Sequence, residues 1–98
     1  MGIPPQANIK LVNSPEYREG YANSVQVRAS VWDFLLVFGR LQQASAAEVE
    51  IQNFQGIYLS PQQAKALMTI LEQNVVQYEK TFGEIKLDAS HQQHGPVH

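Results

Sequence analysis

Apolar and polar residues alternate in the first patterned stretch of the chain, as in a β-strand with one face in water. After the first 20 residues the alternation is regular, with Val25, Val27 and Ala29 on one side and polar residues between them. Residues 34–38 are apolar at every position, which predicts a second, central strand covered on both faces. Gly39 follows, at a position suited to a bulge or a close approach.

A third apolar run, over residues 47–59, predicts another strand. Its alternation assigns four apolar residues to one face, namely Val49, Ile51, Ile57 and Leu59. The middle of the run, residues 53–56, is weaker and predicts a kink, or a turn that splits the run into two strands. The linkers between the runs are too short for crossover helices, so an antiparallel meander is the simplest connection.

The last long pattern has the start and end signals of an α-helix. Ser60 offers an N-cap oxygen, Pro61 suits the first helical position, and Gln63 completes a capping box. Gly83 is placed to end the helix in the left-handed conformation. Together these signals predict a helix over residues 61–82, which would be about 33 Å long.

The apolar positions of this helix form one continuous stripe. Their spacing alternates between four and three residues, through Ala64, Met68, Leu71, Val75, Tyr78 and Phe82. A three-stranded sheet is only about 15 Å wide, so one side of it cannot cover both this helix and the second face of residues 34–38. Either residues 1–20 fold over the remainder, or several copies of the chain share a core.

The sequence favours the second explanation, because contiguous exposed apolar patches are rare on monomers. We therefore expect a homo-oligomer, a dimer or larger. The residues expected at the interface between copies are Met68, Leu71, Val75, Tyr78, Phe82, Leu35 and Val37.

The patterns predict one α+β domain, an antiparallel β-meander of three or four strands followed by one long amphipathic C-terminal helix. Residues 1–20 are rich in turn-forming residues and are interpreted as an N-terminal arm. The domain is expected over residues 21–87, and brief pairing of residues 84–87 could supply the fourth strand. Residues 88–98 are expected to form a disordered tail.

Composition narrows the classes of function. Charged residues make up 16% of the chain and the net charge is −2, so the basic footprint of nucleic-acid binding is missing. The chain contains no cysteine, which excludes disulfides and thiolate chemistry and fits a reducing compartment. No signal-peptide pattern and no apolar run long enough to span a membrane are found. We expect a cytoplasmic protein without membrane contact.

Three histidines near the C-terminus have the spacing of metal ligands on one face of a helix. They are His91, His94 and His98. Gly95 and Pro96 break that helix, so a solvated terminus is the preferred interpretation and no metal site is predicted.

The acidic residues, like the histidines, do not predict a functional site. Glu48 and Glu50 share a strand face and would act as an acid/base pair only if a cleft buried them. Asp33 lies beside an apolar run, where burial would mark a functional site, but capping of the turn at residues 30–31 explains it better. Because no catalytic triad, phosphate-binding loop or paired metal ligands are found, we predict no catalytic, cofactor-binding or metal-binding residues and no enzyme activity.

Four separated blocks of the chain carry a resemblance to a known family. They are YANSVQV at residues 21–27, FLLVFGR at 34–40, LSPQQAK at 59–65 and YEKTFGEI at 78–85. Together they resemble the prokaryotic domain-of-unknown-function 3467 family, over about residues 21–86. This resemblance implies no established activity. A more distant likeness, of a strand meander followed by a long helix, is to the export chaperone SecB.

The likeness to SecB implies an oligomer whose apolar grooves hold unfolded segments of client chains. The residues that would line such a groove are Trp32, Phe34, Phe38, Phe54 and Tyr58. Simple filling of the core is the preferred explanation of the same aromatic residues. The sequence thus predicts a non-enzymatic homo-oligomeric protein-interaction module, either chaperone-like or an assembly subunit, whose partners are its own copies or another protein. The alternative is a small nucleic-acid-binding or regulatory accessory protein.

Overall fold

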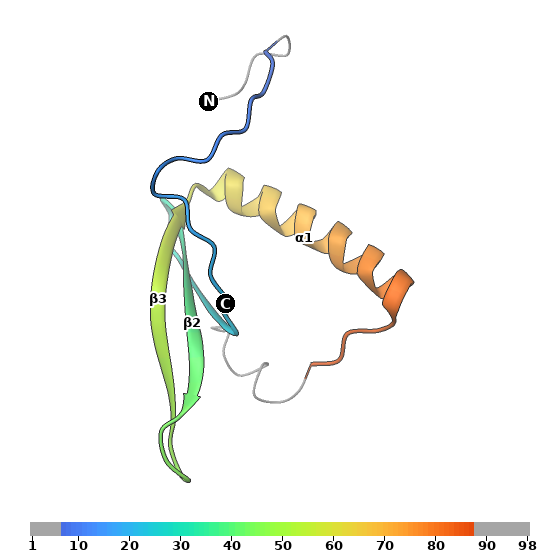
Figure 1. Cartoon of the computed structure of the whole chain (residues 1–98). Coiled ribbons are helices and arrows are strands. Elements are labelled where there is room, and N and C mark those ends of the chain that lie inside the picture. The colour runs from blue at the N-terminus through green and yellow to red at the C-terminus, as the bar shows by residue number, and fades with distance from the viewer. Residues whose placement is uncertain (1–6, 88–98) are drawn as a thin grey trace.

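The chain forms a three-stranded antiparallel sheet followed by one long helix (Figure 1). This computed structural model describes residues 7–87. In chain order the elements are β1 (Ser24–Ala29), β2 (Phe34–Gln43), β3 (Val49–Leu59) and α1 (Pro61–Phe82). β2 lies between β1 and β3 and pairs antiparallel with both, which confirms the predicted α+β meander, with three strands. Residues 84–87 form no fourth strand.

β2 is longer than the apolar run that predicted it. The sequence predicted a strand over residues 34–38, but β2 continues to Gln43 because its second half pairs with the first half of β3. At the tip of this hairpin, the backbone N–H groups of Ala44 and Ser45 donate to the Glu48 carbonyl at 3.0 and 3.1 Å. The polar end of β2 is therefore held in strand conformation by its partner rather than by its own apolar pattern.

A β-bulge interrupts the pairing of β2 with β3. Phe38 pairs with Gln55, whereas the next residue, Gly39, pairs with Asn53, so Phe54 is an extra residue in β3. The weak middle of the third run is thus a bulge within one continuous strand, and not a turn between two strands. Gly39 lies at the irregularity, as its position predicted.

The bulge reverses the side-chain alternation along β3. Val49 and Ile51 pair with alternate residues of β2 that face one side, whereas Ile57 and Leu59 pair with residues that face the other. The prediction that these four residues share one face is therefore wrong. One extra residue shifts a period-two pattern by half a period, which exchanges the two faces beyond it.

The register divides the apolar residues of the sheet between two faces. One face, which we call the arm face, carries Val25, Val27, Phe34, Leu36, Phe38, Phe54, Ile57 and Leu59. The opposite face, which we call the open face, carries Leu35, Val37, Leu41, Val49, Ile51 and Tyr58. Both faces of the sheet are thus apolar, and a single layer of covering chain can shield only one of them.

The turn between β1 and β2 is built on Ser30 and Asp33. The Ser30 backbone N–H donates to the Asp33 carbonyl at 2.9 Å, and the Ser30 hydroxyl donates to Asp33 Oδ1 at 3.2 Å. The backbone N–H groups of Trp32 and Asp33 both lie 3.1 Å from Ser30 Oγ. Asp33 therefore stabilises this turn, as preferred from the sequence, and is not a buried carboxylate.

α1 begins and ends where its local signals predicted. Ser60 Oγ accepts a hydrogen bond from the Gln63 backbone N–H at 3.1 Å, and Pro61 is the first helical residue. Gly83 follows the helix with φ 110 and ψ 169, so its φ is positive as expected, but its ψ is extended rather than left-handed helical. A side chain at this position would strain the backbone, which explains the glycine.

Replacing Ser60 with Ala is expected to lower the free energy of unfolding by about 1 kcal/mol, because the Gln63 N–H would lose its partner. Urea denaturation, monitored by circular dichroism at a fixed protein concentration, measures the change in the free energy of unfolding. Ser60→Asp is the matched control, since its carboxylate can accept the same hydrogen bond and should keep most of the stability. Equal losses in the two variants would show that the cap is not what stabilises the helix start.

Candidate interaction surface

The described residues form no buried hydrophobic core. Among residues 7–87, no hydrophobic side chain is buried, and the one buried polar residue is Ser24, which is 3% exposed. Large apolar side chains are instead open to solvent over the arm, the sheet and the helix. Since burial of apolar surface is the dominant favourable term in folding, surfaces of this kind are the first candidates for a functional site.

α1 stands away from the sheet instead of packing along it (Figure 1). Near its start, Pro61, Ala64 and Leu67 are half-buried, because the helix leaves the end of β3 there. Beyond Leu67 the predicted stripe is exposed, with Leu71 at 54% and Phe82 at 73%. The helix therefore presents more than three turns of apolar surface that no described part of its own chain covers.

We call this surface the helix seam and define it by Met68, Leu71, Val75, Tyr78 and Phe82. The rings of Tyr78 and Phe82 pack against each other, with centroids 4.9 Å apart and planes tilted by 46°. Glu79, on the neighbouring side, is half-buried and its carboxylate accepts a hydrogen bond from the Ile85 N–H at 2.9 Å. This contact ties the segment after the helix to its last turn and leaves the seam free.

The structure places the predicted interface residues on two separate surfaces. Five of them make up the helix seam, whereas Leu35 and Val37 lie on the open face of the sheet, where both are half-buried. The open face also carries Tyr58, which is 66% exposed. A neighbouring molecule would therefore meet either the helix seam or the open face, or both through different contacts.

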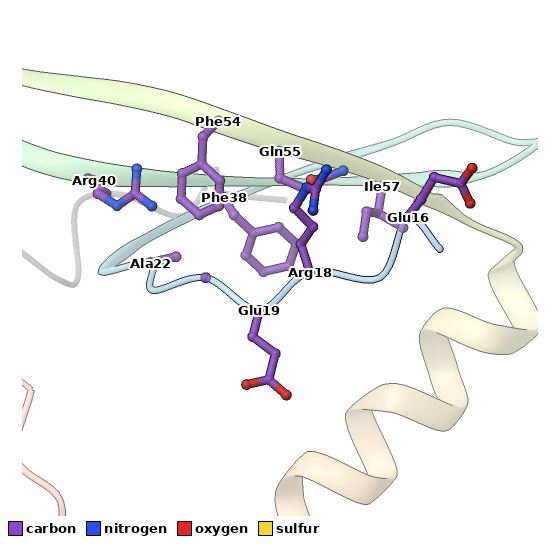
Figure 2. Close-up of a pocket in the computed structure, with 10 residues that line it drawn as sticks. Glu16, Arg18, Glu19, Ala22, Phe38, Arg40, Phe54, Gln55 and Ile57 are labelled. Atoms are coloured by element: carbon purple, nitrogen blue, oxygen red, sulfur yellow. The ribbon is translucent and has the colours of Figure 1, made fainter. Parts of the chain in front are cut away.

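The N-terminal arm crosses the arm face and encloses a hollow of about 650 Å³ (Figure 2). The floor of the hollow is formed by Phe38, Phe54 and Ile57 from β2 and β3. Gly20 of the arm lies so close to Phe54 that an added Cβ would be 3.5 Å from the ring. The described part of the arm, residues 7–20, thus covers part of one sheet face and does not reach over the helix seam.

Charged side chains surround this hollow. The Arg40 guanidinium lies 4.2 Å from the centroid of the Phe54 ring, a cation–π contact, and Arg18, Glu16 and Glu19 line the rim from the arm. The Tyr17 hydroxyl donates to Glu19 Oε2, and this hydrogen bond, together with slight desolvation, raises the pKa of Tyr17 above its ordinary value.

The sequence did not predict the hollow. Its two sides come from segments that are distant in the chain, and the bulge at Phe54 is what brings this ring beside Phe38 on the arm face. The weak pattern at residues 53–56 was the one signal that could have indicated it.

The five aromatic residues proposed for a client groove do not lie together. Phe34, Phe38 and Phe54 lie on the arm face, whereas Tyr58 pairs with Leu35 on the open face. Trp32 lies in the turn between β1 and β2 and is 82% exposed. Only Phe38 and Phe54 meet, as the floor of the hollow.

The remaining candidate groups form no site in the described part of the chain. Glu48 precedes β3 in the hairpin loop, while Glu50 pairs with Gln42 in the strand, and both are exposed. Within residues 7–87 no cluster of side chains could hold a metal ion, and the one helix is neither long nor apolar enough to cross a membrane. His91, His94 and His98 lie outside the described residues, as does the predicted tail.

Comparison with known proteins identifies one family. The family model described as "Protein of unknown function (DUF3467)" matches residues 2–87. No curated protein and no solved structure shows a match to the chain. The match spans the arm, the sheet and the helix, so all three are parts of the family's common unit.

Proposed function

We propose that this chain, which belongs to the DUF3467 family of proteins of unknown function, is a non-enzymatic protein-interaction module that works as a homo-oligomer. The observation that carries the proposal is the absence of any buried hydrophobic side chain within residues 7–87, while the helix seam stands clear of the sheet. A folded domain is stabilised mainly by the apolar area that it removes from water. A second copy supplies the missing cover.

The total surface of the chain supports this proposal. The 98 residues expose 8901 Å². A compact protein of this mass exposes about 5,600 Å². If residues 1–6 and 88–98 contributed as much as an unfolded chain, about 2,700 Å² by the same scaling, the rest would still exceed a compact domain of its own size by roughly 1,200 Å². A standard interface removes about 800 Å² from each partner, so the excess is large enough for one.

The helix seam has the geometry for pairing with a second helix. Its apolar residues recur at the alternating spacing of four and three that keeps two helices in contact along their length. α1 has 22 residues, about three such repeats, and the residues opposite the seam are polar except for Ala66. Two copies that pack seam to seam would bury the apolar stripe and expose the polar side of each helix.

The role of such an assembly follows from its surfaces. Once the helix seam is buried between copies, the open face of each sheet still presents a flat apolar surface that another protein can bind. We therefore place the chain among assembly subunits, in which self-association builds a platform for further protein contacts.

Size-exclusion chromatography with multi-angle light scattering tests the proposal on the full chain. We expect a mass of at least twice 11.0 kDa at micromolar concentration, with dissociation on dilution coupled to loss of circular dichroism at 222 nm. A stably folded monomer of 11.0 kDa at 100 μM would overturn the proposal.

A further inference from the structure

We propose that residues 8–12 of the arm of one copy form an extra strand along the outer edge of β3 in a second copy, with Lys10 opposite Glu50. This inference rests on the proposed self-association, and it assigns a partner to two segments that pair with no other strand within residues 7–87. The docked segment belongs to a second copy of this chain and not to a different protein.

The outer part of the arm has the features of a strand without a sheet. Ile9 and Leu11 are 70% and 92% exposed, and Lys10 lies between them, so apolar and polar side chains alternate. Residues 7–13 have no helix or strand conformation, and the hydrogen bonds described for the arm begin at the turn in which the Tyr17 N–H donates to the Ser14 carbonyl at 3.0 Å. Within the described part of the chain their backbone groups have no hydrogen-bond partner, and they could pair with a strand edge.

β3 offers a matching edge. The strand order β1-β2-β3 leaves one side of β3 without a partner strand in the described structure. Along the first half of this edge, Val49 and Ile51 face the open side of the sheet, and Glu50 lies between them on the other side. An unpaired strand of 11 residues is a ready template for an added strand.

The two segments are complementary in both pattern and charge. If Lys10 lies opposite Glu50, then Ile9 and Leu11 continue the apolar row of Val49 and Ile51 on the open face. Lys10 is the middle residue of 9–11, and Glu50 is the middle residue of 49–51. Reversing the direction of one segment therefore keeps the charged residues opposite each other, and the match holds for parallel and for antiparallel pairing. A register shifted by one residue would place both apolar side chains on the opposite face. A shift of two residues toward Gln52 would keep the faces but would put Lys10 opposite an uncharged residue, and a shift of two toward Glu48 would leave β3, which begins at Val49.

The arrangement of the chain favours exchange between copies. Residues 16–22 of the arm lie along the arm face, but residues 7–13 run away from the sheet at the end where α1 begins (Figure 1). The first half of β3 lies at the opposite end, next to the hairpin tip (Figure 1). In this conformation the segment points away from its own Glu50, so pairing with Glu50 is easier to reach between two copies than within one.

Cross-linking tests the contact directly, because the chain has no cysteine of its own. A Lys10→Cys chain with a mass tag is mixed with an untagged Glu50→Cys chain, unfolded and refolded together, and oxidised. We expect a mixed disulfide between the two chains on a non-reducing gel. Lys10→Cys mixed with Gln73→Cys, which lies on the polar side of α1, is the control and should give at most background cross-linking.

The outcomes separate this inference from the proposed function. If light scattering shows an oligomer but the tagged and untagged chains do not cross-link above the control, the arm contact is wrong and self-association stands. If a single Lys10→Cys/Glu50→Cys chain closes an internal disulfide in preference to the mixed one, the arm pairs with its own sheet and the inference is likewise overturned. If light scattering shows a monomer, both the proposed self-association and the arm contact are overturned.

Charge exchange provides a second measurement that needs no cysteine. Lys10→Glu and Glu50→Lys should each raise the dissociation constant of the oligomer about threefold, since each places like charges opposite one another. The double variant Lys10→Glu/Glu50→Lys restores the opposite pair and should return the constant to near the wild-type value. Additive weakening in the double variant would contradict the pairing of these two residues.

Discussion

Replacing Leu71 with Asp is expected to dissociate the oligomer, and with it to unfold most of the chain. Leu71 lies at the middle of the helix seam and is 54% exposed in the single copy, so the copy alone gives no reason for a large effect. At a seam-to-seam interface the same substitution removes a buried leucine and introduces an unpaired charge. We expect a loss of about 3–5 kcal/mol for each copy, which exceeds the stability available to a small domain whose residues 7–87 bury no hydrophobic side chain.

Gln73→Asp is the matched control for this variant. Gln73 is two residues further along α1, on the opposite side of the helix, and is also exposed. The two variants carry the same new charge and a similar small loss of helix propensity, so they differ in the side of the helix that is changed and in the apolar side chain that Leu71→Asp removes. Light scattering measures the mass of both variants and circular dichroism measures their helix content, at one protein concentration. We expect Gln73→Asp to remain a folded oligomer and Leu71→Asp to lose both mass and helix content. A folded oligomer of Leu71→Asp with the wild-type mass would show that the helix seam is not the interface.

The sequence predicted α1 closely because its boundaries depend on local interactions. Ser60, Pro61 and Gly83 act on hydrogen bonds and backbone angles within one turn of themselves. The local sequence is therefore sufficient to predict where the helix begins and ends. The exposed seam was also predictable, since its spacing is a property of the helix alone. The spacing alone does not identify a partner for this surface.

The side-chain faces of β3 were predicted wrongly because they depend on an interaction with another strand. A strict alternation assigned Val49 and Ile57 to the same side, and the extra residue at Phe54 places them on opposite sides. Whether a strand contains a bulge is decided by how its partner fits against it, here by Gly39 of β2. The same reason explains why the polar end of β2 was not predicted as strand.

The position of the arm on the sheet could not be predicted from the sequence, and neither could the hollow between them. Its inner part lies over the sheet through the contact between Gly20 and Phe54, two residues that are far apart in the chain. No periodicity links them, so the hollow between arm and sheet could not be predicted. The apolar excess of the whole chain was predictable, because it is a sum over all elements and does not depend on how they meet.

Gly39 explains the bulge, and replacing it with Ala gives the second large expected effect. An added Cβ would lie 2.6 Å from Asn53 Oδ1, 3.0 Å from Ile51 Cγ2 and 3.1 Å from the Gln52 carbonyl oxygen. The first contact could be relieved by a side-chain rotation, but the third involves backbone within the paired strand. We expect the free energy of unfolding to fall by about 1–3 kcal/mol, because β2 and β3 must separate to admit the methyl group.

Gly56→Ala is the control that isolates steric crowding from the general effect of a glycine-to-alanine change in a strand. Gly56 lies in the same pair of strands, opposite Val37, and an added Cβ there would be 3.5 Å from Leu35 Cδ1, an ordinary contact. Alanine also reduces the conformational freedom of the unfolded chain, so this variant should be neutral or slightly more stable than the wild type. Thermal unfolding of both variants at one protein concentration measures the difference, which should amount to several degrees in Tm. Equal melting temperatures would mean that Asn53 does not lie against Gly39, and the bulge that separates Val49 from Ile57 would have to be placed elsewhere in β3.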